Sequence, residues 1–125
     1  MALSEIRFDP KGGPVTVEVV FGYVQVGAYA VVLWNMEGKS RRKLGEGINT
    51  DQIPDVYSLP SPVGNNNRAI LDCTATILGG NPGPDERYRV DMIVRQNGVE
   101  CGREYDEGML ASRSVSTRLA VRLVC

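Results

Sequence analysis

The chain has 125 residues, a length that fits a single domain able to bury a core without a metal or disulfide. Hydrophobic residues make up 42% of it, which excludes a disordered chain. Its 14 basic and 15 acidic residues nearly cancel, so we expect no nucleic-acid partner. We also expect no membrane span and, because no secretory signal is visible, a cytoplasmic location by default.

The sequence contains no histidine. Histidine is the commonest general base near neutral pH, the usual partner of a serine or cysteine nucleophile, and the commonest zinc ligand. We therefore expect a non-enzymatic protein without a cofactor, and chemistry by carboxylates alone is the remaining catalytic alternative.

Two short alternating runs open the chain. Ser4–Phe8 predicts a first strand, which ends at the turn-forming cluster Asp9–Pro14. Val15–Phe21 alternates in the way typical of a strand with one face in the core. The next segment, Gly22–Gly27, predicts either a turn between two strands or bulges within one long strand, and the pattern favours neither.

Ala28–Met36 is the most continuously apolar segment and predicts a central strand covered on both faces. A turn at Asn35–Gly38 would return the chain as a polar strand that contains the basic run Lys39–Lys43. Charged residues protect sheet edges, so we interpret this run as an edge strand. In such a hairpin Trp34 lies near Arg41, where a cation–π contact is expected.

The segment Gly45–Asn67 is loop-like throughout. Connections of this length are uncommon in compact domains and are often functional, so we predict that a binding surface lies on this segment. Asp51 and Asp55 offer oxygens suited to calcium, and an aromatic platform for a sugar would use Trp34 and Tyr57.

Two further runs, Arg68–Leu78 and Ser114–Val124, alternate as strands do. In the second run the residues expected to face the core are Leu119, Val121 and Leu123.

The strongest local signal is Asn97-Gly98, which lies between the alternating runs Tyr88–Gln96 and Val99–Tyr105. Asn-Gly suits the positive φ angles of a type I′ turn and predicts a two-residue hairpin. The resulting register places Met92 opposite Arg103 on the apolar face. An arginine fits there only at the rim of the sheet, with a partner, or if the register slips.

The same register places Asp91 opposite Glu104 on the charged face. Two carboxylates can do acid–base work, but Arg89 and Arg95 share this face, so we interpret it as a solvated charged surface.

The three cysteines, Cys73, Cys101 and Cys125, have wide and irregular spacing and form no Cys-x-x-Cys pair. We expect free thiols, the first two in the core. A bridge between Cys73 and Cys101 is the alternative, because both lie on apolar faces.

Together these patterns predict one all-β domain over residues 1–125. It is expected to be an antiparallel sandwich of about seven to nine strands, of immunoglobulin-like, C2-like or jelly-roll kind. The predicted function is a protein-interaction or structural module with a protein partner or self-association, for instance through the unprotected face of Val20, Val24 and Val26. The alternative is a carbohydrate- or calcium-binding module that uses residues 45–67. The candidate binding residues are Trp34, Arg41, Arg42, Asp51, Asp55 and Tyr57.

Overall fold

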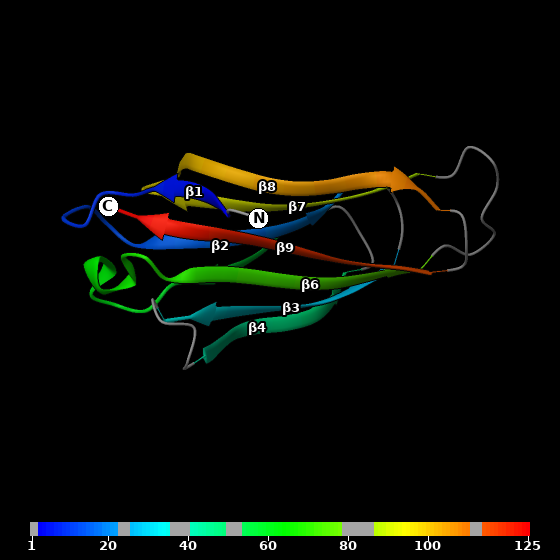
Figure 1. Ribbon diagram of the computed structural model, residues 1–125, viewed down its shortest axis with the longest axis horizontal. Coiled ribbons are helices and arrows are strands. Elements are labelled where there is room, and N and C mark those ends of the chain that lie inside the picture. The colour runs from blue at the N-terminus through cyan, green and yellow to red at the C-terminus, as the bar shows by residue number, and fades with distance from the viewer. Residues whose placement is uncertain (1–2, 23–25, 36–40, 50–53, 79–86, 111–113) are drawn as a thin grey trace.

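The computed structural model describes residues 3–22, 26–35, 41–49, 54–78, 87–110 and 114–125. These residues form two β-sheets packed face to face, which confirms the predicted all-β sandwich (Figure 1). Their strands are β1 (Ser4–Arg7), β2 (Val15–Phe21), β3 (Val26–Trp34), β4 (Arg41–Asn49), β5 (Asp55–Ser58), β6 (Ile70–Leu78), β7 (Arg87–Gln96), β8 (Val99–Met109) and β9 (Ser114–Val124), with one 3-10 turn, η1 (Val63–Asn66).

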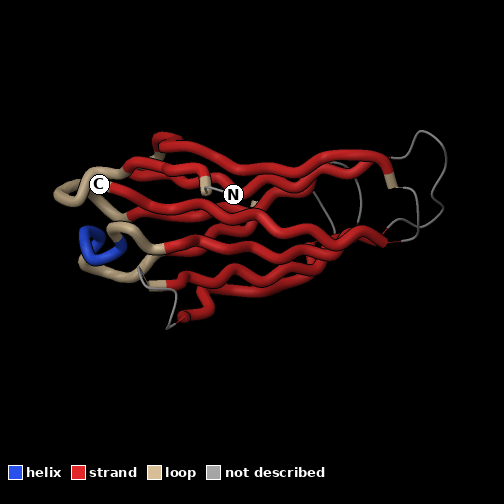
Figure 2. The backbone as a smooth tube through the Cα atoms, viewed as in Figure 1, coloured by secondary structure: helices blue, strands red, loops and turns tan. Residues whose placement is uncertain are grey.

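Sheet A has the strand order β1-β9-β6-β3-β4, and sheet B has the order β5-β2-β7-β8. Neighbouring strands are antiparallel except β1 and β9, which are parallel. Because β2 ends at Phe21 and β3 begins at Val26 in the other sheet, the chain passes from one strand to another here, and the alternative of bulges within one long strand was wrong. The strands follow the long axis of the molecule, and η1 lies at one end (Figure 2).

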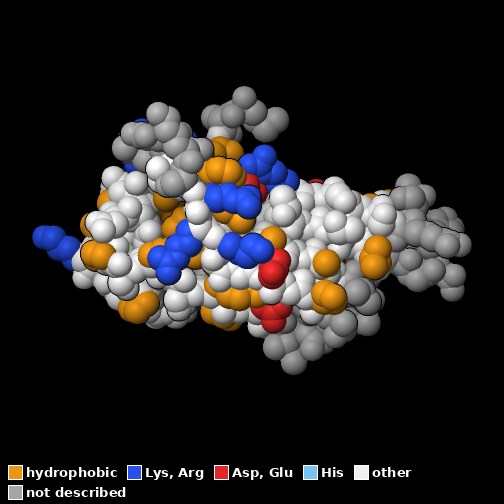
Figure 3. All heavy atoms as spheres, turned by 90° about the horizontal axis from the view of Figure 1, so that it is seen from below, with side chains coloured by type: hydrophobic (Ala, Val, Ile, Leu, Met, Phe, Trp, Pro, Cys, Tyr) orange, Lys and Arg blue, Asp and Glu red, His pale blue; other side chains and the backbone are white. Residues whose placement is uncertain are grey.

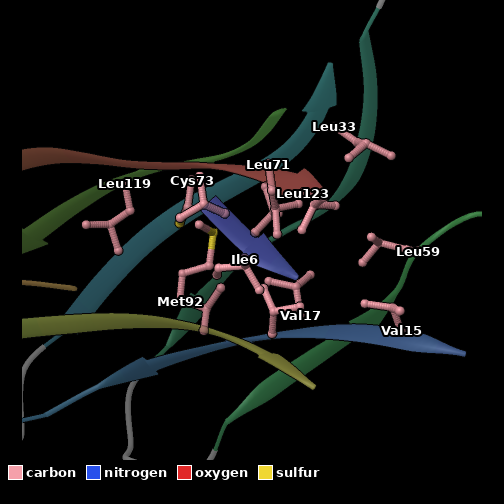
Figure 4. Packing of buried hydrophobic residues seen from close by; sticks show 14 of the residues in the cluster. Ile6, Val15, Val17, Leu33, Leu59, Leu71, Cys73, Met92, Leu119 and Leu123 are labelled. Carbon is pink, nitrogen blue, oxygen red and sulfur yellow. The ribbon is translucent and has the colours of Figure 1, made fainter. Parts of the chain in front are cut away.

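The core fills the space between the two sheets. Val17 and Met92 point from sheet B toward Leu71 and Cys73 of sheet A, and Ile6 of β1 lies among them (Figure 4). The three predicted inward residues of β9 are buried, as expected: Leu119, Val121 and Leu123. Alternation of side chains across each strand therefore builds one buried cluster from both sheets.

The prediction that residues 45–67 form a loop throughout was wrong. Gly45–Asn49 completes β4, and Asp55–Ser58 forms β5, which pairs with β2 through Val17 and Tyr57. β5 has only four residues and little local strand signal, so its pairing with β2 decides its conformation. Residues 50–53 lie outside the described part of the chain.

The Asn97-Gly98 turn forms as predicted, with φ of 53° and 77°, and Gln96 faces Val99. Two residues further on, the register slips by one. Arg95 still pairs with Glu100, but Val94 pairs with Gly102, which leaves Cys101 in a β-bulge. The predicted partners beyond this point were therefore wrong: Met92 faces Glu104, and Val90 faces Asp106.

The bulge has a tertiary cause. It puts Gly102 on the inner face of β8, where β1 packs against it, and a Cβ there would lie 3.0 Å from Cγ1 of Ile6. Any larger residue at this position would push β1 away from β8. A one-residue slip also exchanges the faces of the residues that follow, so Arg103 turns outward and Glu104 turns inward.

The alternative of a Cys73–Cys101 bridge was also wrong, since both are free thiols. Cys73 is buried, and Cys101 in the bulge is half-buried. Burial, with a smaller effect from the neighbouring Asp72, raises the pKa of the Cys73 thiol to about 12. Cys73 therefore acts as a core residue.

Candidate functional site

The basic run that begins β4 forms an edge of sheet A, as the sequence predicted. Lys and Arg side chains gather on the face that β4 borders (Figure 3). Arg41 pairs with Trp34, and its Cζ lies 5.9 Å from the centre of the indole ring, so the predicted cation–π contact is present. Arg42 pairs with Leu33 and is exposed.

Trp34 has a second partner that the sequence did not indicate. Its Nε1 donates to Asp72, 3.3 Å away, on the outer face of sheet A. Arg118 reaches the same carboxylate with Nε at 2.9 Å and Nη2 at 2.6 Å. These hydrogen bonds and the charge of Asp72 raise the pKa of Arg118. Asp72 is only 5% exposed. Its hydrogen bonds join Trp34 and Arg118 on the outer surface of sheet A.

Two other predicted site residues, Asp55 and Tyr57, lie away from Trp34 and meet Tyr29 of β3. The Tyr29 hydroxyl donates to Asp55 Oδ2 at 2.5 Å. Because the single hydrogen of the Tyr29 hydroxyl points at Asp55, this oxygen accepts a hydrogen bond from the Tyr57 hydroxyl, also at 2.5 Å. Gly45 makes room for this cluster, because a Cβ there would lie 2.1 Å from Cε1 of Tyr57.

The six predicted site residues therefore do not form one site. Trp34 and Arg41 lie on the outer face of sheet A, whereas Asp55 and Tyr57 join β5 to the inner face of β3. Asp51 lies outside the described residues. Within the described part of the chain, no group of three or more His, Cys, Asp or Glu is placed to hold a metal ion.

We expect Tyr29→Phe to lower the free energy of unfolding by about 1–3 kcal/mol near pH 7, because a half-buried carboxylate loses its donor. Burial first, and then the bonds to Asp55 and Tyr57, raise the pKa of Tyr29 above its ordinary value. The stabilisation linked to this raised pKa is fully present below about pH 10, the ordinary pKa of tyrosine. It is lost as the pH rises, because the unfolded chain releases the proton first. Urea denaturation from pH 7 to 11 should thus show the gap between wild type and variant narrowing.

The control for this experiment is Tyr105→Phe. Tyr105 is 47% exposed, and its ring lies 4.3 Å from Cζ of Arg89, a contact that phenylalanine keeps. Its free energy of unfolding should stay within about 0.5 kcal/mol of wild type. An equal loss in both variants, or a gap that widens with pH, would contradict the role given to Tyr29.

The outer face of sheet B carries a salt-bridge network instead of the predicted Asp91–Glu104 pair. Because of the bulge, Asp91 faces Tyr105, and Arg103 joins Arg89 on the Asp91 carboxylate at 2.9 and 2.7 Å. Burial alone would raise the pKa of Asp91, but the hydrogen bonds from the two arginines outweigh it, and the pKa is lowered. Glu100 binds the other side of Arg103. The predicted charged face is confirmed, but the predicted pairing of Asp91 with Glu104 across the two strands was wrong.

Only one residue of the face proposed for self-association, Val20, has a described side chain. Val20 pairs with Asp91 on the outer face of sheet B and is half-buried. Val24 and the side chain of Val26 lie outside the described residues.

A groove runs along the side of the sandwich, between β8 of sheet B and β9 of sheet A, at the point where β1 begins. We call it the side groove. It is lined by Leu3 and Ser4 at the start of β1, by Glu104 and Asp106 of β8, and by the stretch 117–120 of β9, which includes Arg118. β1 lies between β8 and β9 at one end of this side of the molecule (Figure 1). β1 pairs with β9 only from Val121 to Val124, so within the described residues the stretch Val115–Ala120 has no strand on that side.

Backbone hydrogen-bonding groups of β9 point into the side groove. The carbonyl of Val124 accepts from Phe8 on the β1 side, whereas the N–H of Leu123 donates toward β6. Peptide groups alternate sides along an antiparallel strand, and the β6–β9 ladder has no bulge. The N–H and C=O of Ser116 and Arg118 therefore face the open edge.

The open stretch of β9 differs from the other sheet edges of the described structure. β4 begins with three basic residues, β5 has four residues, and β8 carries five charges over its central part: Glu100, Arg103, Glu104, Asp106 and Glu107. Charge and shortness are the usual protections of an edge against pairing. Arg118 is the one charged residue of Val115–Ala120, and its charge pairs with Asp72.

Two carboxylates face the side groove from β8. Asp106 Oδ2 accepts from Thr117 at 2.7 Å and from Tyr88 at 3.0 Å. Glu104 accepts a hydrogen bond from the N–H of Tyr105. Among the described residues, neither carboxylate has a salt bridge to a lysine or arginine. Burial and the bond to Asp106 raise the pKa of Tyr88, so its hydroxyl keeps its proton.

The sequence did not identify the side groove. The one hint in the sequence was Arg103, which did not fit the apolar face of the predicted hairpin and so indicated an error in its register. The observed register moves Glu104 and Asp106 to the inner side of β8. The described residues include no helix long and apolar enough to cross a membrane. No family model, curated protein or solved structure matches the chain.

Proposed function

We propose that this protein is a non-enzymatic interaction module that binds another protein chain at the side groove. The observation that carries the proposal is the stretch Val115–Ala120 of β9, a sheet edge with little charge that borders a groove and has no strand beside it among the described residues. Unpaired edges of this kind are templates for pairing with another chain, and proteins normally cover them or protect them with charge.

The composition of the chain and the most buried carboxylates of the described residues support the non-enzymatic part of the proposal. The sequence has no histidine. The two carboxylates that are most buried, Asp72 and Asp91, are each held by an arginine. Such charge-assisted hydrogen bonds occupy both carboxylates and give them a structural role.

Selection of random dodecapeptides displayed on phage tests this function, with the immobilised full chain as bait. Peptides that are then synthesised and measured by fluorescence polarisation should bind saturably, with one peptide per chain. Light scattering over a hundredfold range of protein concentration is run in parallel to detect association with a second copy. A chain that selects no saturable peptide and stays monomeric would overturn the proposal.

A further inference from the structure

The contact between Tyr29 and Tyr57 joins the two sheets through a pair of phenol groups. We propose that this pair is an oxidative modification site. A one-electron oxidant of the radical class, such as the carbonate radical, links the two rings there by a carbon–carbon bond. The product is an intramolecular dityrosine between β3 and β5. The modification does not depend on the side groove, so it is tested independently of the interaction function.

The two rings already have much of the geometry of the cross-linked product. Their hydroxyl oxygens are 2.5 Å apart, and their centroids are 6.2 Å apart with an interplanar angle of 59°. Dityrosine is joined at the ring carbons next to each hydroxyl, so its two hydroxyls lie side by side. The hydroxyl contact of the folded chain is therefore one that the product keeps. Because the fold holds both rings in place, their coupling is effectively a unimolecular step.

Asp55 is the proton acceptor that the oxidation of a phenol requires. The Tyr29 hydroxyl donates to Asp55 Oδ2 at 2.5 Å, so the proton of an oxidised Tyr29 passes directly to this carboxylate. Tyr57 donates to the oxygen of Tyr29. When Tyr57 loses an electron, its proton moves to Tyr29 while Tyr29 passes its own proton to Asp55. Asp55 is half-buried and releases each proton to water.

The complete reaction removes two electrons and two protons from the pair. Each ring gives one electron to one molecule of the oxidant and one proton through Asp55, which leaves two neutral phenoxyl radicals. The unpaired electron of each radical lies partly on the carbons next to the oxygen, and two of these carbons form the new bond. The hydrogen on each bonded carbon then returns to its phenol oxygen through water, which restores both aromatic rings. The product is therefore lighter by two hydrogen atoms.

The oxidant reaches the pair from the side of Tyr57. Tyr29 is buried, whereas Tyr57 is half-buried on β5, an edge strand of sheet B. β5 has only four residues, and Gly45 presents no side chain to the Tyr57 ring. A short edge strand beside a glycine has room for the small shift that brings the two rings together.

The other tyrosines of the described residues have different neighbours. Tyr88 donates to Asp106, and the ring of Tyr105 lies under Arg89. Among the described residues, neither of these two rings contacts another tyrosine ring. An exposed tyrosine such as Tyr105 couples between two copies of the chain, and the yield of that product rises with protein concentration. The yield of the Tyr29–Tyr57 bond is independent of concentration.

The test exposes the full chain to persulfate and light-activated tris(bipyridyl)ruthenium, which together act as a one-electron oxidant. We expect a monomeric product with dityrosine fluorescence, a mass lower by two hydrogen atoms, and a proteolytic fragment in which residues 29 and 57 are joined. Its yield should not change on dilution. In urea that unfolds the chain it should fall by about tenfold or more, because the two rings are no longer held together.

Variants test the roles of the three side chains. Tyr29→Phe and Tyr57→Phe should each abolish the monomeric cross-link, whereas Tyr105→Phe, the matched control, should leave its yield unchanged. Asp55→Asn keeps an acceptor oxygen for Tyr29 but takes up no proton, so the cross-link should form several-fold more slowly. Urea denaturation before oxidation verifies that each variant is folded.

The cross-linked wild-type chain should unfold at a higher urea concentration than the untreated chain. The new bond closes residues 29–57 into a loop and so constrains the unfolded state. A folded wild-type chain that forms no monomeric cross-link would overturn the proposal, whatever the variants do. A dityrosine that maps to other residues, or a yield that survives unfolding, would overturn it as well.

Discussion

Replacing Phe21 with alanine is expected to lower the free energy of unfolding by about 3–5 kcal/mol, the range for removing a buried aromatic ring. Phe21 ends β2, is fully buried and packs at a ring-centroid distance of 6.3 Å from Tyr29. Its ring also lies directly against Gly27 of β3, where a Cβ would be 2.3 Å from Cε1. The phenyl ring therefore fills the space between the sheets that Gly27 leaves open.

Adding a methyl group at Gly27 tests the same fit from the opposite side of the contact. Gly27→Ala should cost about 1–3 kcal/mol, because the new methyl group forces the Phe21 ring out of place. Combining Gly27→Ala with Phe21→Leu should cost less than the sum of the two single changes, since the smaller side chain gives the methyl group room. Urea denaturation of the three variants and wild type measures this coupling.

Val99→Ala is the control for these core variants. Val99 is 68% exposed beside the hairpin turn, so its loss should change stability by no more than about 0.5 kcal/mol. Additive effects of Gly27→Ala and Phe21→Leu would show that the ring and the glycine do not share one space.

The second large effect is expected from Asp91→Asn, which should lower the free energy of unfolding by about 1–3 kcal/mol at pH 7. The change removes the charge that holds Arg89 and Arg103 together, and both arginines remain partly exposed to water. That exposure keeps the loss well below the cost of breaking a fully buried ion pair.

The lowered pKa of Asp91 also predicts how this loss of stability depends on pH. Because the folded-state pKa of Asp91 is lowered, its ionised form stabilises the fold. This stabilisation is fully present above the ordinary carboxyl pKa of about 3.9 and is lost as the pH falls through the folded-state pKa. The gap between wild type and Asp91→Asn in urea denaturation should therefore be constant from pH 7 to about pH 5 and narrow toward pH 2.

Glu46→Gln is the matched control for the acid series. Glu46 pairs with Lys43, three residues earlier in β4, and both side chains are more than half exposed. Such pairs contribute little, so stability should change by less than about 0.5 kcal/mol at every pH. A gap for Asp91→Asn that persists unchanged to pH 2 would show that the carboxylate acts through its shape and not through its charge.

Much of the fold could be predicted from local patterns. Val15–Phe21 and Ser114–Val124 were predicted with the strand bounds that the structure shows, because their alternation matches the two faces of a strand. The Asn97-Gly98 turn was predictable because few other residue pairs adopt its backbone angles. The short β5 was not predictable, since it becomes a strand only by pairing with β2.

The candidate site was less accessible from sequence. The predicted set joined Trp34 and Arg41 correctly, because hairpin register follows from a local turn. It also grouped Asp55 and Tyr57 as binding residues, and the structure assigns them to a hydrogen-bonded cluster around Tyr29. Tyr29 is 26 residues before Asp55, and no local pattern reports such a contact.

The sequence by itself determined which residues form the principal strands and which of their faces are buried, since side-chain alternation is a local property. Only the tertiary structure decided the register of β8. Ile6, nearly a hundred residues earlier in the chain, needs the space beside Gly102, and the bulge at Cys101 provides it. That one-residue slip sends Arg103 to Asp91 and turns Glu104 and Asp106 into the side groove. Packing between distant strands therefore decided where the candidate site lies.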